Sequence, residues 1–360
     1  MAVEATELDA AGIGELYARF TARKRLFIPI GLLVLVLFAM VATSLGAASL
    51  GLGEVFRAIV AKALPFTGVQ SNELADVIVW DLRLPRVLMA IVAGMGFAAS
   101  GATMQGVTRN PLVSPYTIGI SSAAGFGAAL AIVLGVGVVG TDKYIVIANA
   151  FVFALLAAFL VYGMARIRGT TPETLILAGI AMMYLFSAAT SLLQYIGTQE
   201  QVAGVVYWLF GSLTAATWDK LLVVSIFFAV CFPIMMKYSW DLNALAAGDD
   251  TAASLGVNTK RVRVISVTLA TLVTVSIICF TGIIGFVCLV APHITRMVIG
   301  PDHRFLLPCS CIVGGLLLLC ADTLGRMVIQ PAEIPVGIVT SFIGVPMFAY
   351  LLMTRRRQYW

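Results

Sequence analysis

The sequence predicts an all-α polytopic membrane protein with about ten transmembrane helices, and three observations support this fold class. The chain of 360 residues is 60% hydrophobic. Only 11% of its residues are charged, whereas soluble domains carry about 25%. The apolar residues also fall into separate runs long enough to cross a bilayer. A soluble protein with so few charges could not cover its surface, so lipid must solvate much of this chain.

Ten apolar runs are predicted as spans, because a bilayer core about 30 Å thick needs roughly 20 residues of helix. The eighth is the weakest, since it is short and contains Pro292, His293 and Arg296. The spans and their connections form one transmembrane domain, residues 26–353. In chain order, the predicted spans are 26–47, 86–107, 115–137, 143–165, 173–196, 218–237, 262–284, 285–299, 305–327 and 334–353.

The distribution of Lys and Arg predicts the orientation of the spans. If the amino terminus is cytoplasmic and the spans alternate, most of the 23 Lys and Arg residues lie in the cytoplasm, as the positive-inside rule requires. We therefore expect a cytoplasmic amino-terminal segment, residues 1–25, and a basic cytoplasmic tail, residues 354–360. The tail would lie outside if the eighth run did not cross, so the charge bias supports that span.

Two hydrophilic stretches connect the spans, and neither is large enough for a separate soluble domain. Residues 48–85 are expected to form an outer loop, and residues 238–261 a cytoplasmic insert. The insert contains "DLNALAAGDDTAASLGVN", which predicts two short helices. Asp241 can cap the first and Gly248 can end it, one of the residues 249–251 can cap the second, and Gly256 follows its end. Such a knob suits docking into a groove of another protein. An ordinary loop packed on its own helices is an equal alternative.

Residues 101–119, between the second and third spans, read "GATMQGVTRNPLVSPYTIG". Pro111 and Pro115 lack amide hydrogens and restrict the residues before them, so both helices must stop here. Asn110 tolerates turn geometry and can cap exposed backbone. The stretch predicts a tight turn.

The sequence gives no sign of catalysis, and we predict no catalytic residues. It contains no G-x-x-x-x-G-K-[S/T], no H-E-x-x-H and no G-x-S-x-G. The six cysteines lie in or beside apolar runs and are expected to be packing residues. The two histidines are too few and too isolated for a His-based metal cage, so no metal site is expected.

Asp322 and Arg326 are four residues apart in the ninth span and can pair on one helix face. A local ion pair near the outer interface is one interpretation. A proton relay of an ion-driven transporter is the other.

Six stretches carry a resemblance to a known family. They are "LRLPRVLMAIVAGMGFAASGATMQGVTRNPLVSPYTIGISSAAGFGA" (82–128), "LILAGIA" (175–181), "GDDTAASLGVNTKRVR" (248–263), "GIIGFVCLVAPHITRMVIGPDHRFLLP" (282–308), "ADTLGR" (321–326) and "EIPVGIVTSFIGVPMFAYLL" (333–352). In this order they resemble the FecCD-like permeases, the membrane subunits of type II ABC importers for iron-siderophores, haem and vitamin B12. The amino-terminal residues and the 48–85 loop match less well.

The resemblance implies the type II ABC importer permease fold, with ten helices per subunit, in a prokaryotic plasma (inner) membrane. It implies a homodimer, or a pair of homologous permeases, with the pathway on the two-fold axis. Two cytoplasmic ATPase subunits and an outer substrate-binding protein complete the expected assembly. ATP and Mg²⁺ are expected on the ATPase subunits and no cofactor on this chain. No nucleic-acid partner is expected.

The resemblance also implies roles for particular residues. Those expected at the inner gate are Asn110, Leu112, Thr170 and Thr171. Those expected to contact the ATPase, or to shape that contact, are Gly248, Ala252, Leu255 and Gly256. Arg326 is expected to dock the binding protein, with Arg57 and Lys62 as further candidates. His293 is expected to pack or hydrogen-bond rather than to bind metal.

The function expected from these observations is ATP-driven import of a metal chelate by alternating access. The chain itself would be no enzyme. An ion-coupled secondary transporter without an ATPase partner is the alternative, and a membrane scaffold that transports nothing is a third class. Cargo uptake driven by an ion gradient alone would distinguish the secondary transporter.

Overall fold

The computed structural model describes residues 10–46, 48, 50–137, 144–168 and 171–354, and the regular elements in these ranges are all helices. The first half contains α1 (Ala10–Ser44), α2 (Leu52–Ala63), η1 (Pro65–Thr67), α3 (Glu73–Asp76), η2 (Val77–Arg83), α4 (Leu84–Thr108), η3 (Pro115–Ile118), α5 (Ile120–Leu134), α6 (Ile145–Arg168) and α7 (Pro172–Ile196). The second half contains α8 (Gln199–Phe210), α9 (Trp218–Lys237), α10 (Ser239–Ala246), α11 (Asp249–Ser254), α12 (Thr259–Thr281), α13 (Val287–Ile299), α14 (His303–Met327) and α15 (Val336–Thr354).

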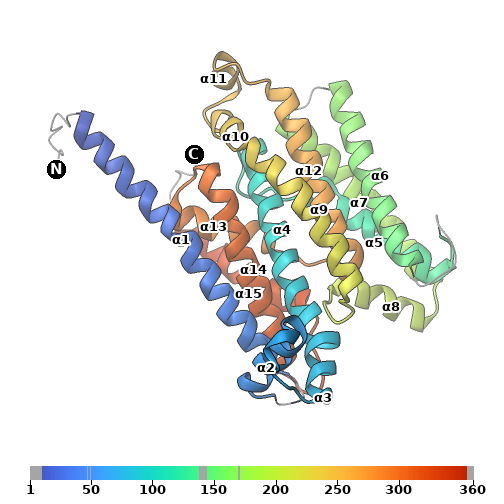
Figure 1. The fold of residues 1–360 in the computed structure, drawn as a ribbon. Coiled ribbons are helices and arrows are strands. Elements are labelled where there is room, and N and C mark those ends of the chain that lie inside the picture. The colour runs from blue at the N-terminus through green and yellow to red at the C-terminus, as the bar shows by residue number, and fades with distance from the viewer. Residues whose placement is uncertain (1–9, 47, 49, 138–143, 169–170, 355–360) are drawn as a thin grey trace.

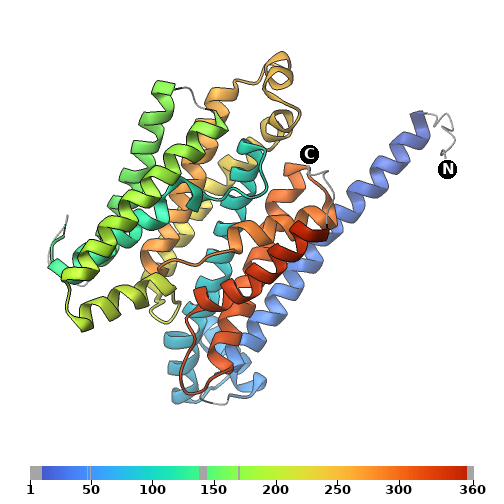
Figure 2. The same cartoon turned by 180° about the vertical axis from the view of Figure 1, so that it is seen from behind.

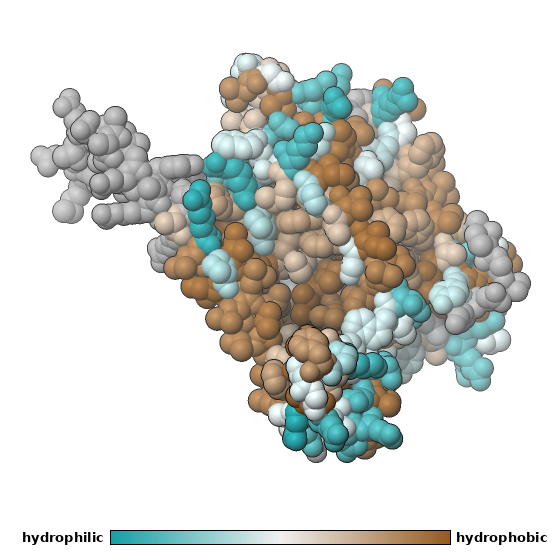
Figure 3. Space-filling model, viewed as in Figure 1, coloured by the Kyte–Doolittle hydropathy of each residue, from teal (hydrophilic) through white to brown (hydrophobic). Residues whose placement is uncertain are grey.

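The long helices run between two ends of the molecule (Figure 1). One end carries α10 and α11, and α1 begins and α15 ends on that side. The other end carries α2 and α3. We refer to them as the α10–α11 end and the α2–α3 end. Side chains on the face shown in Figure 3 are apolar across the middle and polar toward both ends, as a bilayer requires.

Each of the ten predicted spans corresponds to a helix, which confirms the polytopic all-α fold. Seven helices in the described ranges are long and apolar enough to cross a membrane. The remaining three predicted spans correspond to shorter apolar helices, namely α5, α13 and the Val336–Tyr350 part of α15.

Helix α4 lies at the centre of the bundle and α1 at its edge. In the most apolar window of Glu73–Thr108, 83% of residues are buried, against 17% for the window in Lys24–Ser44. The α4 and α14 backbones touch at Gly94 and Gly314, where a Cβ built on Gly94 would lie 2.2 Å from the Gly314 carbonyl oxygen. Only small residues permit such an approach, which strengthens helix packing in a membrane.

Several predicted boundaries are wrong. The second span does not begin at 86, because α3, η2 and α4 form one continuous helical stretch, Glu73–Thr108. The predicted outer loop 48–85 is therefore largely helical. Helix α1 begins at Ala10, within the predicted segment 1–25, and its part suited to crossing a membrane is Lys24–Ser44. Helix α8 was not predicted, because its 12 residues are too few to be a span.

The chain is not helical between α12 and α13, where the prediction placed two abutting spans. Such backbone is tolerated at membrane depth only when protein groups or water satisfy it. Here Ile284 is fully buried and its carbonyl accepts a hydrogen bond of 2.7 Å from the Tyr116 hydroxyl. The Thr281 carbonyl accepts another, also 2.7 Å, from the amide of Ser212.

Candidate functional site

The α4–α5 turn, residues 109–119, lies at the α10–α11 end and contains the first predicted gate residues. Helix α4 stops at Thr108, as the prolines predicted, and Arg109 takes the left-handed conformation with φ 51° and ψ 36°. The Asn110 side-chain oxygen accepts a hydrogen bond of 2.9 Å from the Leu112 amide. Leu112 is 44% exposed, so nearly half of this residue is uncovered in a well-defined turn.

The second predicted gate element begins α7. The Thr171 hydroxyl caps this helix by accepting a hydrogen bond of 3.3 Å from the Thr174 amide. Thr170 lies outside the described residues. The α4–α5 turn contacts α7 directly, because a Cβ on Gly179 would lie 2.1 Å from the Thr117 carbonyl oxygen. The turn that contains the first gate element is thus packed backbone to backbone on α7, at Gly179 rather than at Thr171.

Helices α10 and α11, with Leu255 directly after α11, form a helical hairpin, residues 239–255, as the sequence predicted. Gly248 joins the two helices with φ 113°, and Gly256 follows α11 with φ 83°. The predicted caps are wrong, because α10 follows α9 after a single residue, so the cap position falls on Tyr238. Gly248 itself precedes α11, which leaves Asp249 as the first helical residue.

The predicted coupling residues divide into inward and outward positions. Ala252 is fully buried, whereas Leu255 is 68% exposed. Trp240 on α10 is 63% exposed, and its ring stacks on the Arg304 guanidinium at 4.0 Å. Sequence reasoning missed Trp240, although an aromatic residue in a hydrophilic insert was a visible signal. The hairpin therefore offers two large apolar side chains at the end of the molecule.

Asn243 ties α10 to the start of α14. Its side-chain NH₂ donates to Asp302 at 2.8 Å, and its side-chain oxygen accepts from the His303 amide at 2.8 Å. Burial raises the pKa of the Asp302 carboxyl, but hydrogen bonds from Arg304 and Asn243 outweigh it and leave the pKa below its ordinary value. Asp302 thus stays ionised and caps α14 through the Arg304 amide.

Ion pairs of Asp249 join α11 to the rest of the bundle. The Asp249 carboxylate lies 2.7 Å from the Arg263 guanidinium on α12 and 3.3 Å from that of Arg109. The Arg263 side chain is 5% exposed, whereas those of Arg109 and Asp249 are more than a third exposed.

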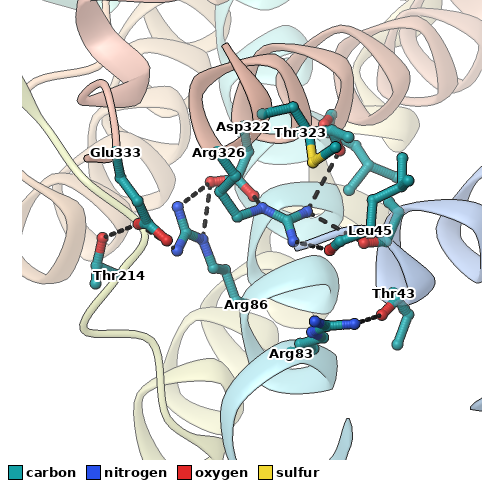
Figure 4. Close-up of polar contacts among 12 residues, drawn as sticks. Thr43, Leu45, Arg83, Arg86, Thr214, Asp322, Thr323, Arg326 and Glu333 are labelled. Atoms are coloured by element: carbon teal, nitrogen blue, oxygen red, sulfur yellow. Dashed lines mark hydrogen bonds and ion pairs between the residues drawn. The ribbon is translucent and has the colours of Figure 1, made fainter. Parts of the chain in front are cut away.

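A charged cluster occupies the opposite side of the bundle, toward the α2–α3 end (Figure 4). Asp322, which is 1% exposed, accepts hydrogen bonds from Arg86 at 3.0 Å and from Arg326 at 3.1 Å. The predicted pairing of Asp322 with Arg326 is present, and the participation of Arg86 was not predicted. Arg86 also pairs with Glu333 at 2.8 Å, and the Thr214 hydroxyl donates to that carboxylate at 3.3 Å.

The arginines of this cluster bind the backbone at the end of α1. Arg326 donates to the Leu45 carbonyl at 2.9 Å, and Arg83 donates to the Thr43 carbonyl at 3.0 Å. Arg326 is 6% exposed, so it braces α14 against α1 in this conformation and has little surface for a partner. Arg57 and Lys62, the other predicted docking residues, are exposed on α2. Sequence reasoning missed Arg83 and Arg86, although two arginines beside a predicted span are a recognisable signal.

Helices α7, α8 and α15 present an uncovered apolar face, and Figure 2 looks onto α7 and α15. Tyr195 is 87% exposed and Phe342 is 77% exposed. A cavity of about 530 Å³ lies between α8, the segment before α13 and α15. Its lining includes Phe210, Ile283 and Val345, with Ser341 among them. Such a surface can contact a second membrane subunit or a large apolar cargo without binding it tightly.

An apolar helical bundle with an uncovered apolar face and a projecting helical hairpin at one end is the architecture expected of a membrane permease. The sequence profile of the FecCD transport family matches residues 32–354. This chain belongs to that family, the permeases of type II ABC importers, and is a multi-pass protein of the inner membrane.

Relatives and a solved structure agree with this membership. The chain is 41% identical to the cobalamin import system permease of Halobacterium salinarum. That match covers 79% of this chain and 75% of the relative. It is 35% identical to the molybdate import system permease of Haemophilus influenzae, over 90% and 94% of the two chains. A solved ABC transporter in an inward-facing conformation, assigned to the metal-chelate type, superimposes with a TM-score of 0.79 at 34% identity. That match covers 91% of this chain and 99% of the other.

Proposed function

We propose that this permease imports a metal chelate, which is an iron-siderophore, haem or a corrinoid. Transport occurs by alternating access, and two cytoplasmic ATPase subunits power it. The observation that carries the proposal is the combination of the projecting α10–α11 hairpin with the uncovered apolar face of α7 and α15. The hairpin offers Trp240 and Leu255 to a partner's groove, while the apolar face suits a large, weakly held cargo. ATP and Mg²⁺ bind the ATPase subunits in this proposal.

The permease works as a homodimer in this proposal, with the pathway between the two copies. A second copy covers the exposed aromatic side chains of α7 and α15. Both termini lie in the cytoplasm with the hairpin, an arrangement supported by α1 and α15, which begin and end on that side. An outer binding protein delivers cargo at the α2–α3 end, where Arg57 and Lys62 are exposed.

The cargo class rests on the cobalamin relative and on the metal-chelate assignment of the solved transporter. A molybdate permease of similar identity shows that this fold also serves a small oxyanion. The lining of the 530 Å³ cavity, which is mostly apolar, favours the bulkier chelate.

The proton-coupled form of the alternative needs a buried acidic group that exchanges protons. Asp322 is the buried acid in the described spans that this alternative would use, and two arginines engage its carboxylate. This pairing favours a structural role and therefore the ATP-driven importer.

Uptake into proteoliposomes tests the proposal. The permease is reconstituted with the ATPase subunits and the binding protein from the same gene cluster, and ferrichrome, haemin, cyanocobalamin and molybdate are supplied in turn. We expect ATP-dependent accumulation of one chelate and none of molybdate. Accumulation driven by a proton or sodium gradient without the ATPase subunits would overturn the ATP-driven importer.

A further inference from the structure

The ion pair between Asp249 and Arg109 connects the α10–α11 hairpin to the α4–α5 turn. Asp249 is the first residue of α11 and Arg109 is the first residue after α4. Their charged groups are 3.3 Å apart. Gly248 brings the hairpin close to this point, since a Cβ there would lie 3.8 Å from an Arg109 guanidinium nitrogen.

The two arginines that bind Asp249 differ in burial. Arg263 is nearly buried on α12 and fixes the carboxylate at 2.7 Å. Arg109 is 36% exposed and belongs to a turn, so its bond to Asp249 can shorten, lengthen or break as the hairpin moves. Because this pair is so exposed, it contributes little to folding stability.

The backbone of Arg109 also sets this residue apart. A non-glycine residue with φ 51° is uncommon, and glycine would take that conformation more readily. The turn therefore keeps an arginine at a position where the backbone favours another residue. Backbone strain of this kind is found at functional sites, where the side chain is needed for the function.

The α4–α5 turn is closely packed on α7. Beyond Arg109 it carries Leu112 and then packs on α7 at Gly119 and Gly179, whose backbones leave no room for a side chain. A shift of the turn toward α7 would therefore push α7, because close-packed backbones resist compression.

We propose that Asp249 is a positioning residue that transmits movement of the α10–α11 hairpin, through Arg109 and the α4–α5 turn, to α7. The inference rests on the proposed function, since the ATPase subunits drive the hairpin. It adds the specific ion pair that converts hairpin motion into motion of the turn and of the pathway face of α7.

Two substitutions break this link without removing the hairpin. Asp249→Asn keeps the size of the side chain, and Arg109→Gly removes the guanidinium while giving the turn the residue its backbone favours. Asp250→Asn is the matched control, because Asp250 also lies in the first turn of α11 but forms no ion pair that the structure describes. Asp249→Glu keeps the negative charge and therefore tests whether a carboxylate at this position is sufficient for coupling.

The complete complex of permease, ATPase subunits and binding protein is reconstituted for each variant. Two quantities are measured: the chelate imported per ATP hydrolysed, and the stimulation of ATP hydrolysis by the binding protein. We expect Asp249→Asn and Arg109→Gly each to lower both quantities at least about fivefold, with the ATPase subunits still bound. We expect Asp250→Asn to match the wild type and Asp249→Glu to recover most of the activity.

The double variant Asp249→Asn/Arg109→Gly provides an independent check. Residues that act as one link give a double variant no worse than either single variant, whereas independent effects add. Thermal unfolding separates coupling from folding, because Arg109→Gly should not lower the unfolding temperature.

The outcomes separate this inference from the proposed function. If the wild-type complex hydrolyses ATP but imports no chelate, the proposed function fails. If the wild type imports and both single variants keep its transport ratio and its stimulation, the ion pair transmits nothing and this inference alone fails. Strictly additive losses in the double variant would also overturn it.

Discussion

The carboxylate of Asp322 on α14 lies 2.9 Å from the guanidinium of Arg86 on α4, with 236 residues of sequence separation between them. Arg326 approaches the same carboxylate from one helical turn away. Asp322 thus fixes α4 to α14, while Arg326 and Arg83 extend the network to the end of α1 (Figure 4).

We expect Asp322→Asn to destabilise the permease. Removing one partner of a buried ion pair leaves uncompensated charge and costs about 3 kcal/mol. The measurement is the midpoint of thermal unfolding of the purified permease in detergent. Asp219→Asn, at an exposed acid in the first turn of α9, is the control and should leave the midpoint unchanged. An unaltered midpoint for Asp322→Asn would contradict the structural role of the pair.

We expect Leu112→Trp to impair uptake at least about tenfold, equivalent to 1.4 kcal/mol, while leaving folding intact. Leu112 is 44% exposed, so a larger ring is not forced into the core and instead obstructs the proposed gate. Leu134→Trp is the matched control, because Leu134 is 48% exposed at the other end of α5. Equal transport by the two variants would show that Leu112 lies outside the path.

We expect Gly248→Arg to weaken assembly with the ATPase subunits, measured by co-purification. The substitution strains a backbone with φ 113° and adds a cation beside Arg109. Gly248→Ala tests the backbone strain alone. Gly68→Arg is the control for a bulky residue at positive φ, since Gly68 has φ 67°, open surroundings and a position between η1 and α3. Unchanged yields of ATPase with Gly248→Arg would remove the hairpin from the proposed interface.

We expect the double variant Arg57→Glu/Lys62→Glu to slow association of the binding protein about tenfold at low salt. Exposed charges steer encounter more than they hold a complex, so the effect should shrink as ionic strength rises. Association rates of the binding protein with permease in nanodiscs provide the measurement. The same charge change at the opposite end, Arg166→Glu/Lys260→Glu, should have no effect. A salt-independent loss would point to misfolding of α2 instead.

Local patterns carried most of what could be predicted. Hydropathy located the ten helical regions, because crossing a bilayer needs a long apolar run wherever it occurs in the fold. Pro111 and Pro115 marked the α4–α5 turn, and Gly248 and Gly256 marked the ends of the hairpin helices, because backbone restrictions act on the residue itself. Asp322 and Arg326 could be paired because one turn of helix separates them.

Other features depended on tertiary structure. The apolar run of α4 did not reveal that it lies at the centre while α1 lies at the edge, since both runs are long and apolar enough to cross a bilayer. The spacing of Arg326 on its helix did not reveal that it binds the backbone at the end of α1, and its docking of the binding protein stays a prediction. The pairing of Asp322 with Arg86 and of Asp249 with Arg109 joins distant parts of the chain. Sequence spacing fixes contacts within a helix, whereas only the packing of whole helices decides which distant side chains meet.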